Sequence, residues 1–290
     1  MNDQAQKLRE IFAKKRDIKE AKTIAVLSGK GGVGKSNFAL NFSIGLSEKG
    51  KRVLLFDLDF GMGNIDVLMG LTPKKTIVQM FKESLRLDEI IEKGHGSLSY
   101  VAAGSGLSEL FQLDNESFEY FVHQLRSVSM SYDYIIFDMG AGMNEHHLHF
   151  ALAAHECFVI TTTEPTSITD AYAVMKHIYA EQKNLPISVL VNRANHQKDG
   201  EETLERLQIA VERFLNQRFQ TLGILPDDRT VVQAVKEQTP FMLKSKHTQI
   251  SQSLLQIIDL YLKQKPYEQS VLPRHSFVTR LKMIFTRKVD

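Results

Sequence analysis

Cysteine is nearly absent from this sequence. The 290 residues include a single cysteine, Cys157. One cysteine cannot form a disulfide within the chain, and it cannot supply the cysteine pair that would bridge an iron–sulfur cluster between two subunits. Cys157 opens the apolar run Cys157-Phe158-Val159-Ile160. We therefore expect it to be a buried strand residue that contributes to packing.

The chain also lacks long apolar runs and a strong net charge. No secretory signal and no stretch of about 18 apolar residues is present, which together with the lone cysteine predicts a protein of the reducing cytosol. The formal net charge of +2 is too small to predict binding to nucleic acid or membrane by bulk electrostatics. Any such surface must come from local clusters of basic residues, and these occur near both ends of the chain.

The chain does contain a complete phosphate-binding loop. The segment Gly29-Lys30-Gly31-Gly32-Val33-Gly34-Lys35-Ser36 fits G-x-x-x-x-G-K-[ST] and lies between an apolar run at 23–27 and a helical pattern that begins near Lys35. The glycines let backbone N–H groups turn toward phosphates, Lys35 supplies a charge at the β- and γ-phosphates, and Ser36 can ligate Mg2+. We expect these residues and the following Asn37 to bind a nucleotide. The alternative is a solvent-exposed glycine-rich turn.

Lys30, directly after the first glycine, is not required by an ordinary phosphate loop. The stretch Lys30-Gly31-Gly32-Val33-Gly34-Lys35-Ser36 resembles the deviant loop of the MinD/ParA class of ATPases. The resemblance implies that Lys30 reaches across a dimer interface to the partner's nucleotide, that ATP joins two identical subunits, and that Lys30 and Lys35 are both catalytic. Otherwise Lys30 is a solvated lysine, the usual state of lysines in loops.

A second apolar run, Val53-Leu54-Leu55-Phe56-Asp57-Leu58-Asp59, ends in two carboxylates. Side chains alternate along a strand, so Asp57 and Asp59 point the same way and both could face the phosphates and the metal. Alternatively one of them caps the following turn, which suits Asp57 better than Asp59. The family resemblance makes Asp59 the residue that positions or deprotonates the attacking water, with 60–64 as a switch loop.

A third apolar run leads from Tyr134 into Asp138-Met139-Gly140-Ala141-Gly142. An aspartate after four apolar residues is the second metal-side element expected of a phosphate-loop NTPase. We expect Asp138 to hold Mg2+ through water and Gly140 to place an N–H near the γ-phosphate. The predicted metal-side residues are therefore Ser36, Asp59 and Asp138.

Two later strand patterns end where a nucleotide base would lie. The runs 187–193 and 222–228 end in Asn192-Arg193 and in Pro226-Asp227-Asp228. In the MinD/ParA class the asparagine amide pairs with adenine and the Pro-Asp loop closes over it, which implies base-binding roles for Asn192, Arg193, Pro226 and Asp227. Guanine recognition normally uses [NT]-K-x-D, and the nearest candidate, at 196–199, begins with histidine. Adenine is therefore expected.

Two other groups of polar residues are ambiguous. His146, His147 and His149 lack a carboxylate or cysteine at ligand spacing, so we expect surface histidines on a helix rather than a metal site. Glu164 and Asp170 follow a further strand. The resemblance places this segment beside the dimer interface and makes both residues candidate cross-subunit contacts, but capping of the next helix is equally plausible.

The first 20 residues are highly charged, with Leu8, Ile11, Phe12 and Ile18 on one side of a predicted helix. This apolar stripe packs on the main domain or enters a groove of another protein. The opening Asp3-Gln4-Ala5-Gln6-Lys7-Leu8-Arg9 resembles the N-terminal motif of flagellar regulators of the FlhG (FleN/YlxH) family. In that family the segment activates the signal-recognition-type GTPase FlhF, which implies partner-binding roles for Asp3, Gln4, Leu8 and Arg9.

The C-terminal tail predicts a second amphipathic helix. At about 100° per residue its apolar side chains fall within an arc of about 120°, flanked by basic residues; they are Phe277, Val278, Leu281, Ile284 and Phe285. This pattern is typical of a helix in an anionic membrane interface. Their burial gains about 8–15 kcal/mol gross, whereas ordering costs about 1–2 kcal/mol per residue. One copy should bind marginally, and an ATP-dependent dimer would add avidity. The alternative is a helix docked on the main domain.

The alternating pattern predicts a doubly wound, mostly parallel α/β domain. We expect a partner segment at 1–20, an ATPase domain at 21–265, and a linker with a membrane-binding helix at 266–290. The resemblance implies a slow, dimerising ATPase that uses ATP and Mg2+ and regulates flagellar number and placement. Its expected partners are FlhF, lipids of the inner membrane face in the ATP state, and flagellar basal-body components.

The alternatives are a MinD-type division-site ATPase and a ParA-type partition ATPase. A third possibility is a binding module whose first 20 residues stimulate a partner GTPase. Basic residues concentrated on a membrane-type helix argue against nucleic-acid binding, because a DNA-binding protein needs many phosphate contacts.

Overall fold

The computed structural model describes residues 20–59, 63–104, 115–263 and 276–286. Several predictions concern other parts of the chain and lie outside these residues. They are the partner-binding residues Asp3, Gln4, Leu8 and Arg9, the first part of the switch loop at 60–62, and most of the linker.

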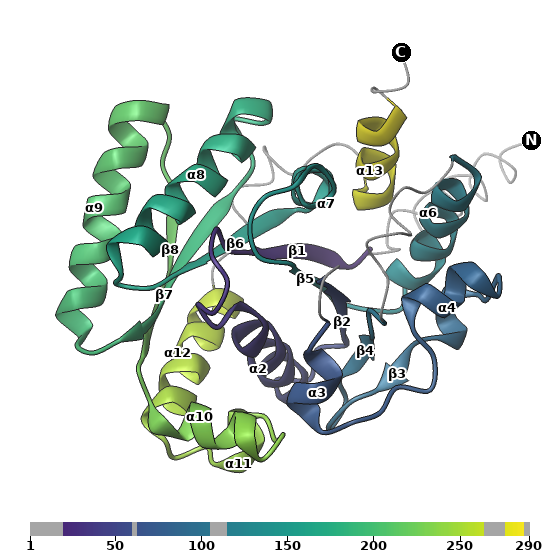
Figure 1. Cartoon of the computed structure of the whole chain (residues 1–290), viewed down its shortest axis with the longest axis horizontal. Helices are drawn as coiled ribbons and strands as arrows, with labels where there is room; N and C mark the ends of the chain where they lie inside the picture. Colours follow the sequence, from purple (N-terminus) through teal and green to yellow (C-terminus); the bar gives the residue numbers. More distant parts are fainter. Residues whose placement is uncertain (1–19, 60–62, 105–114, 264–275, 287–290) are drawn as a thin grey trace, which may run out of the picture.

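An eight-stranded sheet with the order β3-β4-β2-β5-β1-β6-β7-β8 forms the centre of the fold (Figure 1). The strands are β1 (Lys22–Leu27), β2 (Val53–Leu58), β3 (Glu92–Lys93), β4 (Ser99–Val101), β5 (Tyr134–Met139), β6 (Glu156–Thr161), β7 (Ile187–Ala194) and β8 (Gln220–Pro226). β3 pairs antiparallel with β4, and the other pairs are parallel. The predicted doubly wound, mostly parallel architecture is confirmed.

Helices cover both faces because the central strands are apolar on both sides. In β1, Ala25 and Leu27 face one layer, whereas Ile24 and Val26 face the other. The first layer holds α4 (Ile77–Lys82), α6 (Asn115–Ser129), α7 (Glu145–Ala153), α8 (Pro165–Glu181), α9 (Gln197–Leu215) and α13 (Phe277–Thr286). The second holds α2 (Lys35–Glu48), α3 (Ile65–Met69), α10 (Arg229–Lys236), α11 (Phe241–Lys244) and α12 (Gln249–Lys263).

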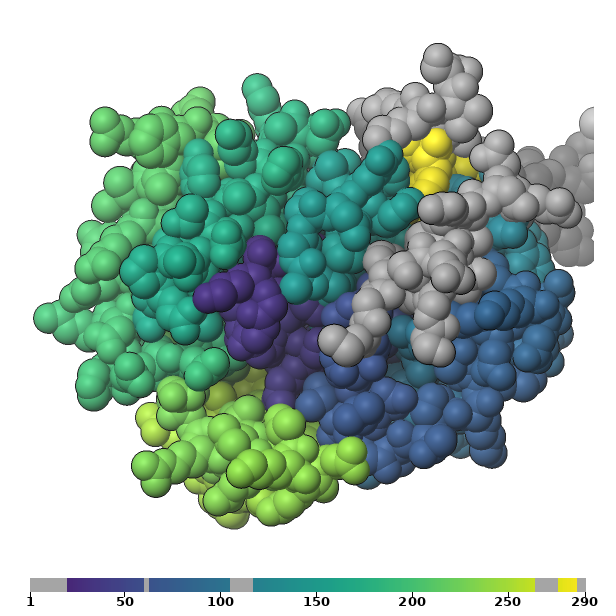
Figure 2. Space-filling view, viewed as in Figure 1, coloured from purple at the N-terminus to yellow at the C-terminus, as the bar shows by residue number. Residues whose placement is uncertain are grey.

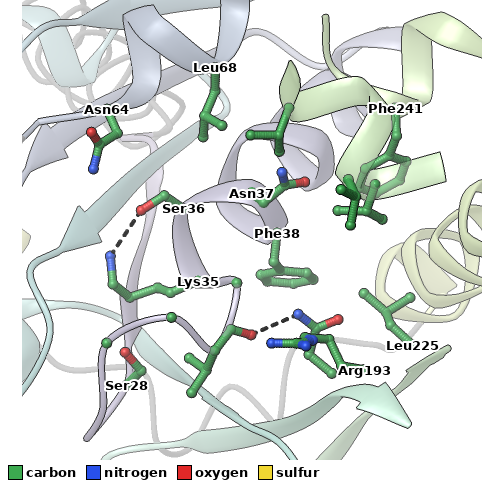
Figure 3. A pocket seen from close by; sticks show the side chains of 18 of the residues that line it. Ser28, Lys35, Ser36, Asn37, Phe38, Asn64, Leu68, Arg193, Leu225 and Phe241 are labelled. Atoms are coloured by element: carbon green, nitrogen blue, oxygen red, sulfur yellow. Dashed lines mark hydrogen bonds between the residues drawn. The ribbon is translucent and has the colours of Figure 1, made fainter. Parts of the chain in front are cut away.

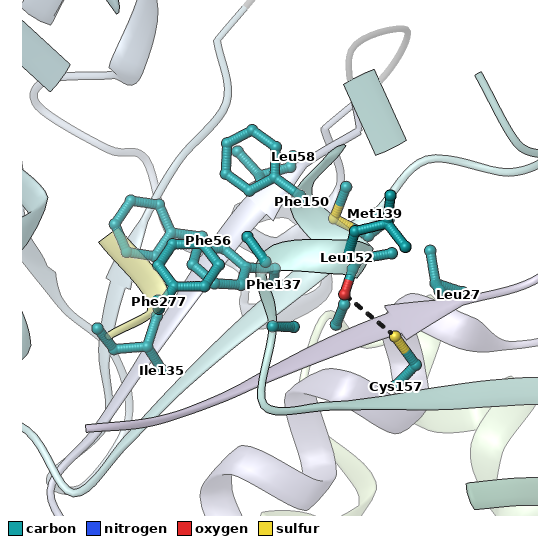
Figure 4. Packing of buried hydrophobic residues seen from close by; sticks show 14 of the residues in the cluster. Leu27, Phe56, Leu58, Ile135, Phe137, Met139, Phe150, Leu152, Cys157 and Phe277 are labelled. Atoms are coloured by element: carbon teal, nitrogen blue, oxygen red, sulfur yellow. Dashed lines mark hydrogen bonds between the residues drawn. The ribbon is translucent and has the colours of Figure 1, made fainter. Parts of the chain in front are cut away.

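Cys157 is a fully buried residue of β6, as predicted. Its thiol donates to the carbonyl of Ala151 at 3.6 Å (Figure 4). Burial raises the pKa of the thiol, so Cys157 contributes packing rather than reactivity.

Although the sequence of 71–96 suggests a series of short helices, this segment is not helical throughout. It contains α4 and the 3-10 helix η1 (Leu87–Glu89), but it ends in β3, which forms a hairpin with β4. Gly96 has a φ of 64° in the turn of this hairpin, a conformation that glycine adopts at low cost. A two-residue edge strand carries too little pattern to be separated from a loop in the sequence.

The C-terminal helix α13 packs against α6 and α7 in this structure (Figure 1). Phe277 stacks on Phe137 with ring centroids 5.0 Å apart, and Phe285 stacks on Phe118 at 3.9 Å. Figure 4 shows Phe277 among the aromatic residues of the sheet face. Phe277, Val278 and Leu281 are buried, whereas Ile284 and Phe285 are partly buried. The docked alternative for this helix is therefore the arrangement that the structure contains.

Candidate membrane spans are absent from the described ranges. Within 20–59, 63–104, 115–263 and 276–286, no helix has the length and apolar character needed to cross a bilayer.

Candidate functional site

The phosphate loop connects β1 to the first turn of α2, and it reaches the surface in the purple segment at the middle of the face in Figure 2. Gly34 precedes α2 with a φ of 88°, and no side chain caps this helix. A Cβ at Gly34 would lie 2.4 Å from Nδ2 of Asn192. The loop therefore needs glycine here for its backbone angle and for space, and it leaves the N–H groups of the first turn of α2 uncapped by side chains. Such a helix start is suited to phosphate oxygens.

Lys35 and Asp138 form a buried ion pair beneath the loop. Lys35 Nζ lies 2.5 Å from Asp138 Oδ1. It also lies 3.3 Å from Ser36 Oγ (Figure 3). Burial raises the pKa of the Asp138 carboxyl, and the Lys35 ammonium and the Ser36 hydroxyl act in the opposite direction. The second carboxylate oxygen of Asp138 is buried and has no hydrogen-bond partner among the residues that the structure describes. A free carboxylate oxygen near a serine hydroxyl fits a hard divalent cation such as Mg2+.

The two aspartates of β2 differ in their surroundings. Asp57 is buried, and its carboxylate accepts backbone N–H groups from Asp59 and Ile65, each at 3.1 Å. Asp59 is partly buried and lines the cavity around the phosphate loop. Of the two alternatives for Asp57, capping of the turn after β2 is the one that the structure contains, because both of its oxygens accept backbone N–H groups there. Burial, with the nearby Asp138 carboxylate, raises the pKa of Asp57 to about 7.

A cavity of about 790 Å3 extends from the phosphate loop to the ends of β7 and β8. It brings together most of the predicted nucleotide-binding residues: Lys30 to Asn37, Asp59, Asn192, Arg193, Pro226 and Asp227. Gly29, Asp138 and Gly140 are not among its lining residues. Asn192 Nδ2 donates to the carbonyl of Val33 at 2.8 Å, and Arg193 Nε lies 3.6 Å from Asp227 Oδ1.

Sequence reasoning missed the apolar end of the cavity. Phe38, Leu225, Val231, Phe241 and Ile250 line it, and Figure 3 shows Leu225 and Phe241 across the pocket from Lys35 and Ser36. Apolar walls next to polar groups suit the flat face of a base. Phe38 follows the phosphate loop directly, which is a usable signal. The residues of α10, α11 and α12 have none, because any helix that packs on the sheet shows the same apolar pattern.

Lys30 projects from the loop toward the start of α8. Its ammonium lies 3.0 Å from Glu164 Oε2 and 3.3 Å from Thr166 Oγ1. The Lys30 and Glu164 side chains are 44% and 58% exposed. Glu164 does not cap α8 through its side chain, so the capping alternative does not hold for this residue. The backbone of Asp170 packs closely against Gly29 of the phosphate loop, because a Cβ at Gly29 would lie 2.4 Å from the Asp170 carbonyl oxygen.

The histidines of α7 are not on the surface, contrary to the prediction. His147 and His149 are 3% and 7% exposed, and His146 is partly buried. The N-terminal turn of α7 packs beneath the loop that contains Gly140, and Phe285 of α13 lies on His149 with centroids 4.7 Å apart. Among the described residues, no three or more histidine, cysteine or carboxylate side chains are grouped so that they could hold a metal ion by themselves.

Comparison with known proteins places this geometry among nucleotide-binding proteins. Residues 21–191 match a family model described as an AAA domain. The antiactivator FleN of Pseudomonas aeruginosa is 35% identical over 215 residues, which cover 74% of this chain and 77% of FleN. The flagellum site-determining protein YlxH of Helicobacter pylori is 33% identical over 293 residues, covering 97% and 98%.

Septum site-determining proteins MinD are also similar. That of Synechocystis is 30% identical over 234 residues, covering 77% of this chain and 82% of the relative. The solved structure of MinD from Pyrococcus horikoshii in complex with Mg-ADP has a TM-score of 0.70 at 20% identity, covering 84% of this chain and 96% of that one. This structural likeness shows the shared fold.

Proposed function

Because the chain belongs to the MinD/ParA family of P-loop ATPases, we propose that it uses an ATP-dependent dimer to regulate the number and placement of flagella. As a member of this family it hydrolyses ATP with Mg2+. The observation that supports the flagellar role most strongly is the match to YlxH, which spans 98% of that relative and 97% of this chain. The MinD match covers less of this chain, 77%.

Each part of the site has a proposed task. Lys35 and the loop N–H groups hold the β- and γ-phosphates, and Ser36, Asp59 and Asp138 are the metal-side residues. When bound, Mg2+ neutralises charge that develops on the phosphates. Asp59 orients the attacking water, and the Gly140 N–H stabilises the γ-phosphate. Asn192, Arg193, Pro226 and Asp227 hold the adenine against the apolar wall at Phe241 and Val231.

Lys30 links ATP to dimer formation in this proposal. In the single chain its ammonium pairs with Glu164 of the same subunit, and both side chains are well exposed. An exposed ion pair contributes only about 0–1 kcal/mol. The triphosphate of a partner subunit carries more charge than one carboxylate, so Lys30 can exchange Glu164 for that phosphate at low cost. Glu164 would then hold Lys30 only in the monomer.

The tail provides the proposed membrane attachment. Phe277, Val278 and Leu281 are buried against the domain here, so α13 must leave α6 and α7 before these side chains can enter a membrane. A membrane would bury the apolar face of α13 again, but release also exposes the surface of α6 and α7 that the helix covers, so one tail alone gains little from release. Two tails on an ATP dimer bind one membrane with avidity that a single tail lacks. We thus infer that ATP shifts α13 from the docked to the membrane-bound state.

The domain boundaries proposed from the sequence correspond to these roles. Residues 21–265 form the ATPase, 266–290 the linker and membrane helix, and 1–20 the segment that stimulates the GTPase FlhF. Support for the last role is the motif that contains Asp3, Gln4, Leu8 and Arg9, together with the flagellar relatives FleN and YlxH.

Two assays test this function. Deletion of residues 1–20 should abolish stimulation of GTP hydrolysis by FlhF and leave ATP hydrolysis by this chain unchanged. Flotation with anionic liposomes should recover the full-length protein with Mg-ATP and much less with Mg-ADP. Unchanged FlhF turnover after the deletion would remove the FlhF role, and equal flotation in both nucleotides would remove the membrane switch.

A MinD-type role in division is the second candidate, supported by the MinD relatives. Loss of the gene separates the two roles. The flagellar proposal predicts cells with an altered number or position of flagella and normal septa, whereas misplaced septa would favour the division role.

A further inference from the structure

His147 is a buried side chain at the start of α7 for which the sequence gives no function. Its backbone N–H donates to Oδ1 of Asn144, the residue that caps α7, at 2.7 Å. Its ring nitrogen Nδ1 lies 3.2 Å from the carbonyl oxygen of Gly142. Both bonds return to the loop at 140–144 that follows β5, so His147 is attached to this loop by backbone and side chain together.

The hydrogen bonds define the protonation of the ring. A carbonyl oxygen only accepts, so Nδ1 must carry the proton that is donated to Gly142. Burial lowers the pKa of His147 to about 4, so the ring is neutral near pH 7 and Nε2 is an acceptor. Nδ2 of Asn144 lies 3.5 Å from Nε2, consistent with this tautomer. The ring thus has a defined orientation.

The outer edge of the ring lies against Gly140. A Cβ built on Gly140 would be 2.9 Å from Cε1 and 3.2 Å from Nε2 of His147, and 3.4 Å from Oδ1 of Asp59. The imidazole and the Asp59 carboxylate therefore border the same side of Gly140. This close approach fixes the position of the Gly140 backbone relative to Asp59, and it requires glycine at 140.

We propose that His147 is a positioning residue for ATP hydrolysis, which holds the turn 140–144 so that the Gly140 N–H and the Asp59 carboxylate act on the same γ-phosphate. The inference rests on the proposed roles of Gly140 and Asp59. His147 is not a catalytic residue, because it acts through the loop and not on the nucleotide. Loss of its Nδ1–H bond loosens this turn, while the Gly142 N–H still donates to the Ser28 carbonyl at 2.9 Å.

The test compares three variants under single-turnover and steady-state conditions. His147→Leu introduces an apolar side chain of similar volume that has no hydrogen-bond donor. His147→Asn provides an amide donor near the position of Nδ1. The surface residue His177 on α8 provides the control, His177→Leu. We expect His147→Leu to lower kcat about 10-fold or more. The KM for ATP and the dissociation constant of the ATP-induced dimer should change less than about 2-fold. This is the pattern of a lost transition-state interaction.

His147→Asn should recover most of kcat, and His177→Leu should match the wild type. A purely structural role for His147 would lower the Tm of both His147 variants without separating kcat from KM, and that result would overturn the proposal, as would wild-type kcat in His147→Leu. Asp59→Asn is measured beside them. If it hydrolyses ATP at the wild-type rate, the proposed role of Asp59 fails, whereas an inactive Asp59→Asn with a fully active His147→Leu contradicts only the role of His147.

Discussion

At the scale of single residues, the buried pair of Lys35 and Asp138 shows how the site is prepared for an anion and a cation. The two side chains are 6% and 1% exposed, so each charge depends on the other when phosphate is absent. In the proposed function, a triphosphate would give Lys35 additional oxygen partners and free the Asp138 carboxylate for the metal. In the absence of ligands, each side chain of the ion pair therefore occupies the position of the other's proposed ligand, phosphate for Lys35 and the metal for Asp138.

We predict that Asp138→Ala destabilises the nucleotide-free protein by about 3–5 kcal/mol, because it leaves a buried ammonium without a counter-charge. ATP without metal should restore part of this loss, since its phosphates also neutralise Lys35. Urea unfolding measures both effects. Asp88→Ala, which breaks the exposed pair with Arg86, is the control and should cost at most about 1 kcal/mol. Equal losses in the two variants would show that Lys35 does not depend on Asp138.

The residue scale also shows where sequence reasoning fails. Asp57 and Asp59 have the same alternation along β2, yet only Asp59 lines the cavity, because Asp57 meets two backbone N–H groups from the turn. His147 looks like a surface residue in the sequence and is buried because its loop folds over it. Spacing predicts the direction of a side chain, but its partners depend on loop conformations that the spacing does not contain.

At the scale of elements, the docked helix α13 contains a polar conflict. Arg280 is 8% exposed, and its Nη1 donates to the Ala154 carbonyl at 2.9 Å. Its Nε and Nη2 have no hydrogen-bond partner within the described part of the chain. Burial lowers the pKa of this guanidinium to about 10. Unsatisfied buried donors destabilise the docked state by about 1–3 kcal/mol. Arg280 therefore keeps α13 closer to release than its apolar contacts alone would.

We expect Arg280→Met to strengthen docking by about 1 kcal/mol, because the long apolar stem remains and the unpaired donors are removed. Amide hydrogen exchange across 277–286, without lipid, should slow. Lys282→Met removes a charge from the exposed pair with Glu119 and should leave exchange nearly unchanged. Liposome flotation with Mg-ATP should fall more for Arg280→Met than for Lys282→Met. Faster exchange in Arg280→Met would mean that the arginine stabilises docking.

Most elements could be predicted from the sequence because they are long and buried on one or both faces. The central strands are continuous apolar runs, and α6, α9 and α12 have apolar stripes at helical spacing. The short edge strand β3 and the wall of the cavity from α10 and α11 could not be predicted, because they depend on contacts between residues far apart in the chain. The helix α13 was predicted, but its apolar face suits a protein surface and a membrane equally.

At the scale of the whole molecule, β1 and the chain at the start of β6 are joined through a partly buried, neutral histidine. The Thr23 N–H donates to Nδ1 of His155 at 3.0 Å, and Thr23 Oγ1 lies 2.6 Å from the same nitrogen. Burial, together with the nearby charges of Arg280 and Lys22, lowers the pKa of His155 to about 3. In the unfolded chain its pKa is near the ordinary value of about 6.5.

The unfolded state therefore binds the His155 proton at a higher pH than the folded state, so stability falls as pH drops below about 6.5. Between about pH 7 and pH 5 this residue alone should remove about 2 kcal/mol from the free energy of unfolding. Urea unfolding at the two pH values, with wild type and His155→Gln, measures it. Between these two pH values the free energy of unfolding of His155→Gln should fall by about 2 kcal/mol less than that of the wild type. The same pH dependence in both proteins would contradict a neutral His155 in the folded state.

The proposed function requires that the whole molecule form a dimer around ATP, with Lys30 exchanged from Glu164 to the partner's nucleotide. The mass in solution of Asp59→Ala, whose hydrolysis is blocked, tests this most directly at saturating Mg-ATP. We predict a dimer with Mg-ATP and a monomer with Mg-ADP. Adding Lys30→Ala should return the protein to a monomer, whereas Lys198→Ala, on the exposed face of α9, should not. A monomer for Asp59→Ala with Mg-ATP would contradict the account.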